Sequence, residues 1–291
     1  MNPIRFNIPP AQRIILLLLT FLLGLIVTAF LSTFLLKVGG ESKYLAMLRI
    51  GTVAQDLFML IFPAVITAMV ITRQPARLLC LDTKPSLKLL WAALVVMIVS
   101  SPMMTWIIKL NQSMTFPPAL AELEQWMRTS EESAAGSINL MLGAHTPVNL
   151  IINLLIVGVL AGLAEELFFR GALQRVLQSC RMPAVAAVWI TAVIFSAVHM
   201  QFFGFVPRLL LGAFFGYLLL WSGSVWLPVA AHVFNNCMFV LLNYFTGSGD
   251  PEISGSSVVT WLAPLISCIL TVAALWFMYR GRVERTAVAA K

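Results

Sequence analysis

Residues 148–177 read VNLIINLLIVGVLAGLAEELFFRGALQRVL, and this stretch decides the fold class. Its first half, Leu150 to Leu163, is compatible with lipid and has Asn153 as its one polar side chain. From Glu165 onward the pattern is amphipathic. A membrane span needs about 20 apolar residues and must pair its backbone N–H and C=O groups within the segment. Long runs of Leu, Ile, Val, Ala and Phe therefore predict transmembrane helices rather than short alternating strands.

The whole chain has the composition of a polytopic membrane protein. Of its 291 residues, 60% are hydrophobic and 11% are charged, and the mean hydropathy is +0.91. Soluble domains carry about 25% charged residues, so this chain has too few charges to cover a water-facing surface. The formal net charge of +7 comes from Lys and Arg at segment ends, which is typical of membrane proteins. We therefore expect an all-α protein in a lipid bilayer, with no nucleic-acid partner.

Eight segments are long and apolar enough to span the membrane. The first is too long for the apolar core of a signal peptide and is not followed by a clear small-residue cleavage site, so we interpret it as a span. The sequence has no internal repeat, and one membrane domain over residues 1–291 is sufficient. The predicted spans are 13–36, 52–72, 88–108, 148–177, 183–201, 206–222, 226–245 and 258–279.

One long connection separates the early spans from the later ones. Phe116-Pro117-Pro118 lies near its start, where proline fixes the backbone and removes a donor. The following run, Ala119 to Arg128, is amphipathic and is expected to lie along the membrane interface. The domain thus divides into N-terminal spans (1–110), an extramembrane loop with an interfacial helix (111–147), core spans (148–245) and a last span (258–279).

The distribution of Lys and Arg predicts the orientation. With the N-terminus in the cytoplasm, 13 of the 19 Lys and Arg residues fall on the cytoplasmic side and 6 on the other. This asymmetry predicts that both termini are cytoplasmic, and we expect the bacterial inner membrane as the location. The four cysteines lie far apart without a C-x-x-C pair, so we expect neither a disulfide framework nor a cysteine metal site.

The first cluster of polar residues within a span is Glu165-Glu166-Leu167-Phe168-Phe169-Arg170. Glu166 and Arg170 are four residues apart, so they share a helical face and suit an ion pair. Glu165 points about 100° away and lacks that partner, which leaves it suited to general acid–base work. The alternative is a helix that leaves the membrane, with both glutamates among the lipid headgroups.

Two further clusters contain histidine. His199 ends the segment Phe195-Ser196-Ala197-Val198-His199, where an interfacial role is the alternative to catalysis. His232 and Asn236 are four residues apart in the seventh predicted span and could converge on one substrate group, whereas Asn235 lies on another side. Ionisable groups at mid-bilayer cost about 2.5–3.5 kcal/mol on insertion scales, so they usually serve a site.

Depth along the helices predicts part of this convergence. Glu165 and His199 lie at similar depths about the turn near residues 178–183, within one helical turn at about 1.5 Å per residue. His232 fits less well, because it is roughly 20 Å below the outer end of its span while His199 is roughly 7 Å deep. Gly158 and Gly162 precede Glu165 on its own face, and this G-x-x-x-G spacing predicts the close approach of another helix.

In this order, Glu-Glu-x-x-x-Arg, Phe-x-x-x-His and His-x-x-x-Asn resemble the CAAX protease and bacteriocin-processing family. It includes the Ras-converting CAAX prenyl endopeptidases and the bacterial immunity proteins often called Abi proteins. The resemblance covers about 150–245, including Gly223-Ser224-Val225-Trp226-Leu227-Pro228. It implies eight helices with a cavity among the fourth to seventh spans, and a water activated by Glu165 and His199.

The resemblance also implies roles for the remaining motif residues. His232 and Asn236 would steady the oxyanion that forms from the peptide carbonyl. Glu166 and Arg170 match the other motif positions, where we favour a structural ion pair.

The favoured function is hydrolysis of a peptide bond in a membrane-associated or prenylated-type substrate. Two chemistries remain open. Glu165 and His199 could deprotonate water directly, or Glu165, His199 and His232 could bind zinc, since two His and a carboxylate form a known ligand set. No H-E-x-x-H is present, and we favour a metal-free site with no required cofactor.

Two non-peptidase functions are the alternatives. One is a membrane binding or bacteriocin-immunity protein that holds a peptide in the same cavity. A transporter is less favoured, because the sequence has no repeated halves.

Overall fold

The computed structural model describes residues 8–40, 43–247 and 257–289, and within these ranges the chain is helical with no β-strand. Two long continuous helical rods contain π-helical segments. The first consists of α2 (Tyr44–Gln55), η2 (Asp56–Ile61) and α3 (Phe62–Ile71). The second consists of α7 (Pro147–Asn153), η4 (Leu154–Leu160), α8 (Ala161–Glu166), η5 (Leu167–Gln174) and α9 (Arg175–Ser179). The remaining long helices are α1 (Pro10–Gly39), α5 (Leu87–Gln112), α6 (Ala121–Leu142), α10 (Ala184–Ala197), α11 (Phe205–Ser222), α12 (Trp226–Thr246) and α13 (Ser257–Ala289). Short helical turns are α4 (Pro75–Leu78), η3 (Pro118–Leu120) and η6 (Phe202–Gly204).

Six helices among the described residues are long and apolar enough to cross a membrane. They correspond to six of the eight predicted spans, so the integral membrane assignment is confirmed. The other two predicted spans fall on α10, which has only 14 residues, and on α12, which has 21 residues and carries His232 and Asn236. The total of eight spans and their orientation therefore stay predictions. The six candidate spans are Pro10–Leu35, Tyr44–Ile71, Leu87–Gln112, Pro147–Ser179, Phe202–Ser222 and Trp261–Arg280.

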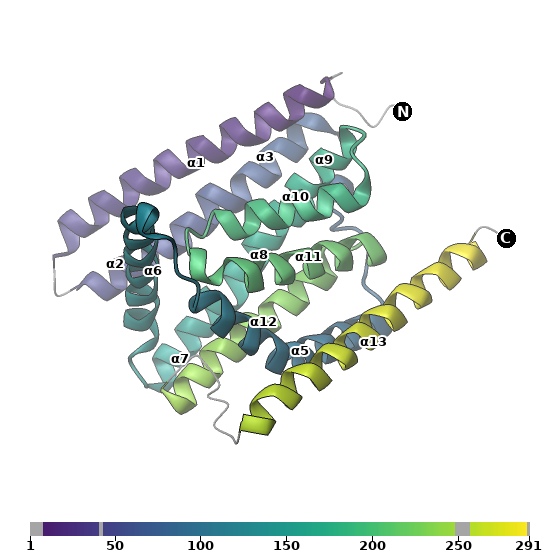
Figure 1. Ribbon diagram of the computed structural model, residues 1–291. Helices are drawn as coiled ribbons and strands as arrows, with labels where there is room; N and C mark the ends of the chain where they lie inside the picture. Colours follow the sequence, from purple (N-terminus) through teal and green to yellow (C-terminus); the bar gives the residue numbers. More distant parts are fainter. Residues whose placement is uncertain (1–7, 41–42, 248–256, 290–291) are drawn as a thin grey trace.

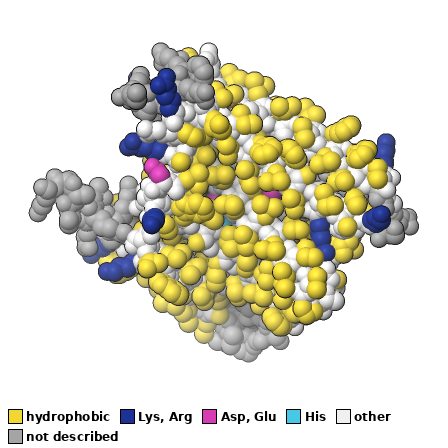
Figure 2. Space-filling model, turned by 180° about the vertical axis from the view of Figure 1, so that it is seen from behind, with side chains coloured by type: hydrophobic (Ala, Val, Ile, Leu, Met, Phe, Trp, Pro, Cys, Tyr) yellow, Lys and Arg dark blue, Asp and Glu magenta, His cyan; other side chains and the backbone are white. Residues whose placement is uncertain are grey.

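The helices that carry the motifs lie in the middle of the bundle. In Figure 1, α1 and α3 flank one side and α5 and α13 the other, with α8, α10, α11 and α12 between them. Figure 2 shows the opposite face of the molecule, where hydrophobic side chains dominate and Lys and Arg gather towards the margins. This is the surface expected of a protein whose solvent is hydrocarbon.

Helix α6 lies in the long connection that the sequence predicts to be extramembrane. It runs for 22 residues, from Ala121 to Leu142, well beyond the amphipathic stretch predicted to end at Arg128. The helix packs on α2 and η6. The Glu131 carboxylate accepts a hydrogen bond from the Phe203 backbone N–H, and the Arg128 guanidinium lies 4.2 Å from the centre of the Phe203 ring. These contacts dock α6 on the loop that follows His199.

Glycines bring the motif helices close together, as the G-x-x-x-G spacing predicted. A Cβ added at Gly158 would lie 2.6 Å from Cys237 Sγ, and one at Gly162 would lie 3.0 Å from Val233 Cγ2. The backbone of the rod that contains α8 therefore lies directly against side chains of α12. On α11, a Cβ at Gly212 would lie 3.0 Å from the Phe195 ring. These close approaches bring the polar side chains of separate helices within reach of one another.

Candidate active site

Three side chains from three elements meet at one carboxylate oxygen. Glu165 lies on α8, His199 in the turn after α10, and His232 on α12. The Nε2 atom of His199 is 3.9 Å from Glu165 Oε2, and Nε2 of His232 is 3.8 Å from the same oxygen. The side chains are partly or fully buried, with exposed fractions of 18% for Glu165, 27% for His199 and 5% for His232. The structure thus brings together the three residues whose convergence the sequence only partly predicted.

The depth mismatch expected between the two histidines is absent. The expectation assumed that the fifth span continues as a helix to residue 201, but α10 ends at Ala197 and His199 lies in the turn that follows. Met200, the next residue, has a left-handed backbone with φ of 55°. The chain therefore turns at His199, and its imidazole approaches the same Glu165 oxygen as His232 does.

Hydrogen bonds determine how both histidine rings are oriented. Nδ1 of His199 lies 2.7 Å from the Phe195 carbonyl oxygen, which can only accept, so this nitrogen carries a proton. Nδ1 of His232 lies 2.7 Å from Glu166 Oε1, which also accepts from Arg170, so it too donates. In the neutral ring each Nε2 then has a free lone pair. Both lone-pair nitrogens face Glu165 Oε2, which accepts no hydrogen bond from the described residues.

Glu166 and Arg170 form a fully enclosed half of the site. Arg170 Nη1 is 2.6 Å from Glu166 Oε1, and both side chains have an exposed fraction of 0%. Arg170 Nη2 donates to the Gly212 carbonyl at 2.9 Å. Its guanidinium also lies 4.5 Å from the centre of the Phe195 ring, within the range of cation–π attraction. The pair is enclosed by protein on all sides and does not lie among headgroups.

Helix α12 contributes the second imidazole and an amide. The His232 ring stacks on Phe215 of α11, with ring centres 4.8 Å apart and planes inclined by 26°. One turn later, Asn236 Nδ2 donates to the Val157 carbonyl at 3.2 Å, and its Oδ1 accepts from Asn235. These bonds orient the amide and leave its second N–H available. The described contacts join Asn236 to η4 and not to Glu165.

The structure adds one acidic residue that the motifs did not include. Asp56 lies in η2 with an exposed fraction of 3%, and η2 packs against α8, the helix that carries Glu165. The signal was present in the sequence, because Asp56 is the one Asp or Glu within the first three predicted spans. An ionisable residue within a span is a candidate for function by itself.

Glu165, His199 and His232 are the residues that would hold zinc if the site used a metal. Zinc binds imidazole nitrogen and carboxylate oxygen at about 2.0–2.2 Å. Across the part of the chain that the structure describes, no three His, Cys, Asp or Glu side chains are arranged to hold a metal ion. Dependence on zinc is a question for chelation experiments.

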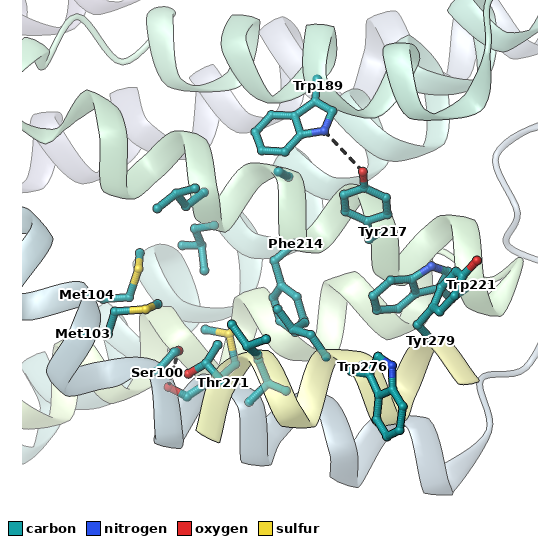
Figure 3. Close-up of a pocket in the computed structure, with 17 residues that line it drawn as sticks. Ser100, Met103, Met104, Trp189, Phe214, Tyr217, Trp221, Thr271, Trp276 and Tyr279 are labelled. Atoms are coloured by element: carbon teal, nitrogen blue, oxygen red, sulfur yellow. Dashed lines mark hydrogen bonds between the residues drawn. The ribbon is translucent and has the colours of Figure 1, made fainter. Parts of the chain in front are cut away.

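A separate apolar cavity of about 490 Å³ lies on the other face of α11 (Figure 3). Phe214 points into this cavity, whereas its neighbour Phe215 stacks on His232. The Ser100 and Thr271 hydroxyls of the cavity donate to carbonyls of their own helices. The lining is therefore compatible with hydrocarbon and contains no ionisable carboxyl group. It comes from α5, α10, α11 and α13.

A comparison with known families identifies the motif region. Residues 147–238 match the family model described as type II CAAX prenyl endopeptidase Rce1-like. This segment is thus similar to an Rce1-like domain. This domain contains Glu165, His199, His232 and Asn236, so the resemblance seen in the three motifs is confirmed and points to a peptidase. The Rce1-like domain begins at α7 and ends within α12, and the N-terminal spans and α13 lie outside it. Searches among curated proteins and solved structures found no match.

Proposed function

We propose that this protein is an intramembrane endopeptidase that hydrolyses a peptide bond with a water activated by glutamate and histidine. The observation that carries the proposal is the position of Glu165 Oε2, which two imidazole Nε2 atoms face from separate elements at 3.8 and 3.9 Å. These gaps are too long for direct hydrogen bonds. They suit a water molecule that donates to the carboxylate and to an imidazole at once.

In this mechanism Glu165 is the general base, with His199 beside it. As the water oxygen attacks the peptide carbonyl carbon, its proton passes to Glu165 and the carbonyl oxygen gains negative charge. The same proton then passes to the peptide nitrogen, the C–N bond breaks, and an amine and an acid leave. The Phe195 carbonyl keeps the proton of His199 on Nδ1, which directs Nε2 towards the water.

Helix α12 supplies the groups proposed to stabilise the oxyanion. The contact of its Nδ1–H with Glu166 orients the His232 ring, and its Nε2 is the proposed donor to the oxyanion in the form of the ring that carries a proton there. The second N–H of Asn236 is the other candidate donor, because the first is held by Val157. Donors that are fixed before the charge develops need no reorganisation in the transition state. The Glu166–Arg170 pair then serves as the support that holds His232 in place.

We expect the substrate to be membrane-associated, of the prenylated type that the family's name indicates. A site within a bundle whose outer face is largely hydrophobic is reached most readily by a chain already held at the membrane (Figure 2). Which protein carries that chain is a question for the experiment below.

The test compares membranes that contain wild-type protein, Glu165→Gln, or Glu132→Gln as a matched control on exposed α6. Proteomic detection of new peptide termini should reveal products with the wild type and the control. The Glu165→Gln protein should lose about 10²–10⁴-fold of the turnover, the usual contribution of general base catalysis. Cleavage that continues in Glu165→Gln protein would refute the mechanism.

Two further measurements separate the alternatives. Purified wild-type protein should keep its activity in the presence of EDTA. Loss of activity that added zinc restores would show metal chemistry instead. A biological phenotype that survives in folded Glu165→Gln protein, with no peptide cleaved by any variant, would favour a binding or immunity protein.

A further inference from the structure

A polar pocket of about 790 Å³ lies at one end of the bundle, and no residue of the candidate active site lines it. Its walls come from the segment between α3 and α5, from the first residue of α9 and from the turn between α11 and α12. Directly after α9, the Cys180 thiol donates to the Pro10 carbonyl at 3.3 Å. The pocket therefore lies near the end of the bundle at which α1 begins (Figure 1), and the charge distribution predicts that this end is cytoplasmic.

Three arginines share this pocket with one acidic residue. Arg73 and Arg77 are exposed, Arg175 is half-buried, and Asp82 is the acidic residue of the lining. Within the part of the chain that the structure describes, none of the three arginines forms an ion pair. Three positive charges against one negative charge leave an excess of two. The preference of cytoplasmic loops for Lys and Arg accounts for arginine at this end, but not for three guanidinium groups around one concave pocket.

Hydrogen bonds hold the walls of the pocket in place. The loop after α4 is bound to the turn between α11 and α12 through three of its backbone carbonyls. Cys80 accepts from the Val225 N–H at 3.1 Å, Leu81 from the Trp226 indole N–H at 2.9 Å, and Thr83 from the Ser224 hydroxyl. On the other side, Arg175 Nε donates to the Leu78 carbonyl at 3.4 Å. Cys80 has a left-handed backbone with φ of 55°, a conformation that persists where the surrounding structure fixes it.

We propose that this pocket binds a phosphate-bearing anion through Arg73, Arg77 and Arg175. The planar guanidinium group matches the oxygens of a phosphate with two parallel hydrogen bonds. A phosphate monoester carries about 1.5 to 2 negative charges near neutral pH, which matches the excess of two better than the single charge of a carboxylate does. Walls that are already fixed reduce the entropy lost on binding.

The position of the pocket fits two sources of phosphate. Basic pockets at the cytoplasmic ends of membrane helices suit the anionic headgroups of lipids. The pocket also opens away from the bundle end, where a free phosphate in water can reach the exposed Arg73 and Arg77. In either case the ligand would join three separate segments of the chain. It does so outside the candidate active site, so its binding is independent of the peptidase function.

Binding is measured on the purified full-length chain in dodecyl maltoside at low ionic strength. Isothermal titration calorimetry with pyrophosphate tests a free phosphate, and native mass spectrometry with phosphatidic acid tests a lipid headgroup. Phosphatidylcholine, whose headgroup has no net charge, is the matched lipid control and should bind less than phosphatidic acid does. Binding of pyrophosphate supports a free phosphate as the ligand, and binding of phosphatidic acid alone supports a headgroup. Failure of both to bind overturns the proposal.

Substitutions then locate the bound anion. Arg73→Gln and Arg175→Gln should each raise the Kd about tenfold, because each removes a charged donor. Arg175 also supports the loop through Leu78, so the exposed Arg73 provides the variant that leaves the fold intact. Asp82→Asn should lower the Kd, because it removes the negative charge of the lining.

Arg181→Gln is the matched control. Arg181 is exposed in the turn after α9 and does not line the pocket, so its variant loses the same charge and should keep the wild-type Kd. Equal values of Kd for Arg73→Gln, Arg181→Gln and wild type would overturn the proposal, since the anion would then bind elsewhere. Equal increases for Arg73→Gln and Arg181→Gln would overturn it as well, because net charge and not the pocket would then decide the affinity.

Discussion

Two Glu–Arg pairs in this chain have the same spacing and the same length but opposite surroundings. Glu166 and Arg170 lie four residues apart on one rod at 2.6 Å, and both side chains have an exposed fraction of 0%. Glu124 and Arg128 lie four residues apart on α6, also at 2.6 Å, with exposed fractions of 18% and 41%. Both pairs have the i, i+4 spacing, and this spacing alone does not distinguish them. Burial alone decides what each pair contributes.

The buried pair supports the active site, whereas the exposed pair fastens a loop. Glu166 Oε1 accepts from both Arg170 and His232, so the pair fixes the imidazole that faces Glu165. Glu124 accepts from Arg128 and from the Phe116 backbone N–H, which closes the turn that leads into α6. Charges in a low-dielectric interior interact strongly, and water cannot replace a lost partner there. At an exposed site, water can replace the lost partner. The same type of ion pair thus holds a residue of the candidate active site in one place and closes a surface turn in the other.

Arg170→Met should have the largest effect on stability. It leaves Glu166 buried without its cation, and breaking a buried pair in this way costs about 3–5 kcal/mol. SDS titration in mixed micelles, followed by circular dichroism, measures the free energy of unfolding. Arg128→Met is the matched control and should change this free energy far less, because Glu124 remains in contact with water.

A second variant separates the charge from the side-chain volume. Glu166→Gln combined with Arg170→Met removes both charges, so the double variant should be more stable than Arg170→Met alone. Equal losses for Arg170→Met and Arg128→Met would break the comparison, since burial would then make no difference.

Much of this arrangement was accessible from the sequence. The helical class followed from apolar runs, and six predicted spans match helices long enough to cross a membrane. The i and i+4 spacing predicted which glutamate would face Arg170. Gly158 and Gly162 predicted the close approach of another helix, and the structure shows that this helix is α12. These features are local, because a few neighbouring residues on one helix determine them.

Features that depend on several helices at once were missed or misjudged. Counting residues placed His199 and His232 at different depths, since the early end of α10 and the turn at Met200 leave no periodic signal. The three π-helical segments pack against α1, α8 and α12, which lie far from them in sequence or in the same rod. Asp56 was visible as an acid within a span, but its burial depends on the packing of η2 against α1, α3 and α8.

Glycine variants provide a smaller test of the same contrast between buried and exposed helices. A Cβ at Gly212 would lie 3.0 Å from the Phe195 ring and 3.3 Å from Arg170 Nη2, so Gly212→Ala should destabilise by about 1–3 kcal/mol through overpacking. Gly136 on exposed α6 has no atom within 4 Å of an added Cβ. Gly136→Ala should therefore stabilise by up to about 1 kcal/mol, because alanine favours the helix. The SDS titration measures both, and two changes of the same sign would contradict the packing described here.

The smallest effect is expected from the exposed pair, and it depends on pH. Hydrogen bonding from the Phe116 backbone N–H, and then from Arg128, holds the pKa of Glu124 below the ordinary value of 4.5. A folded-state pKa below the unfolded value means that the stabilisation is complete above pH 4.5 and is lost as the pH falls through the lower, folded value. Trp126 lies on the same helix with its ring centre 5.3 Å from that of Phe202, so its fluorescence reports the docking of α6. Subtracting the fluorescence spectrum of Trp126→Phe from that of wild type isolates the emission of Trp126, which should change at acidic pH. The same subtraction between Glu124→Gln and the Glu124→Gln, Trp126→Phe double variant should show no such change. An identical acid transition on both backgrounds would show that Glu124 does not hold the turn, and the exposed pair would then be incidental to the docking of α6.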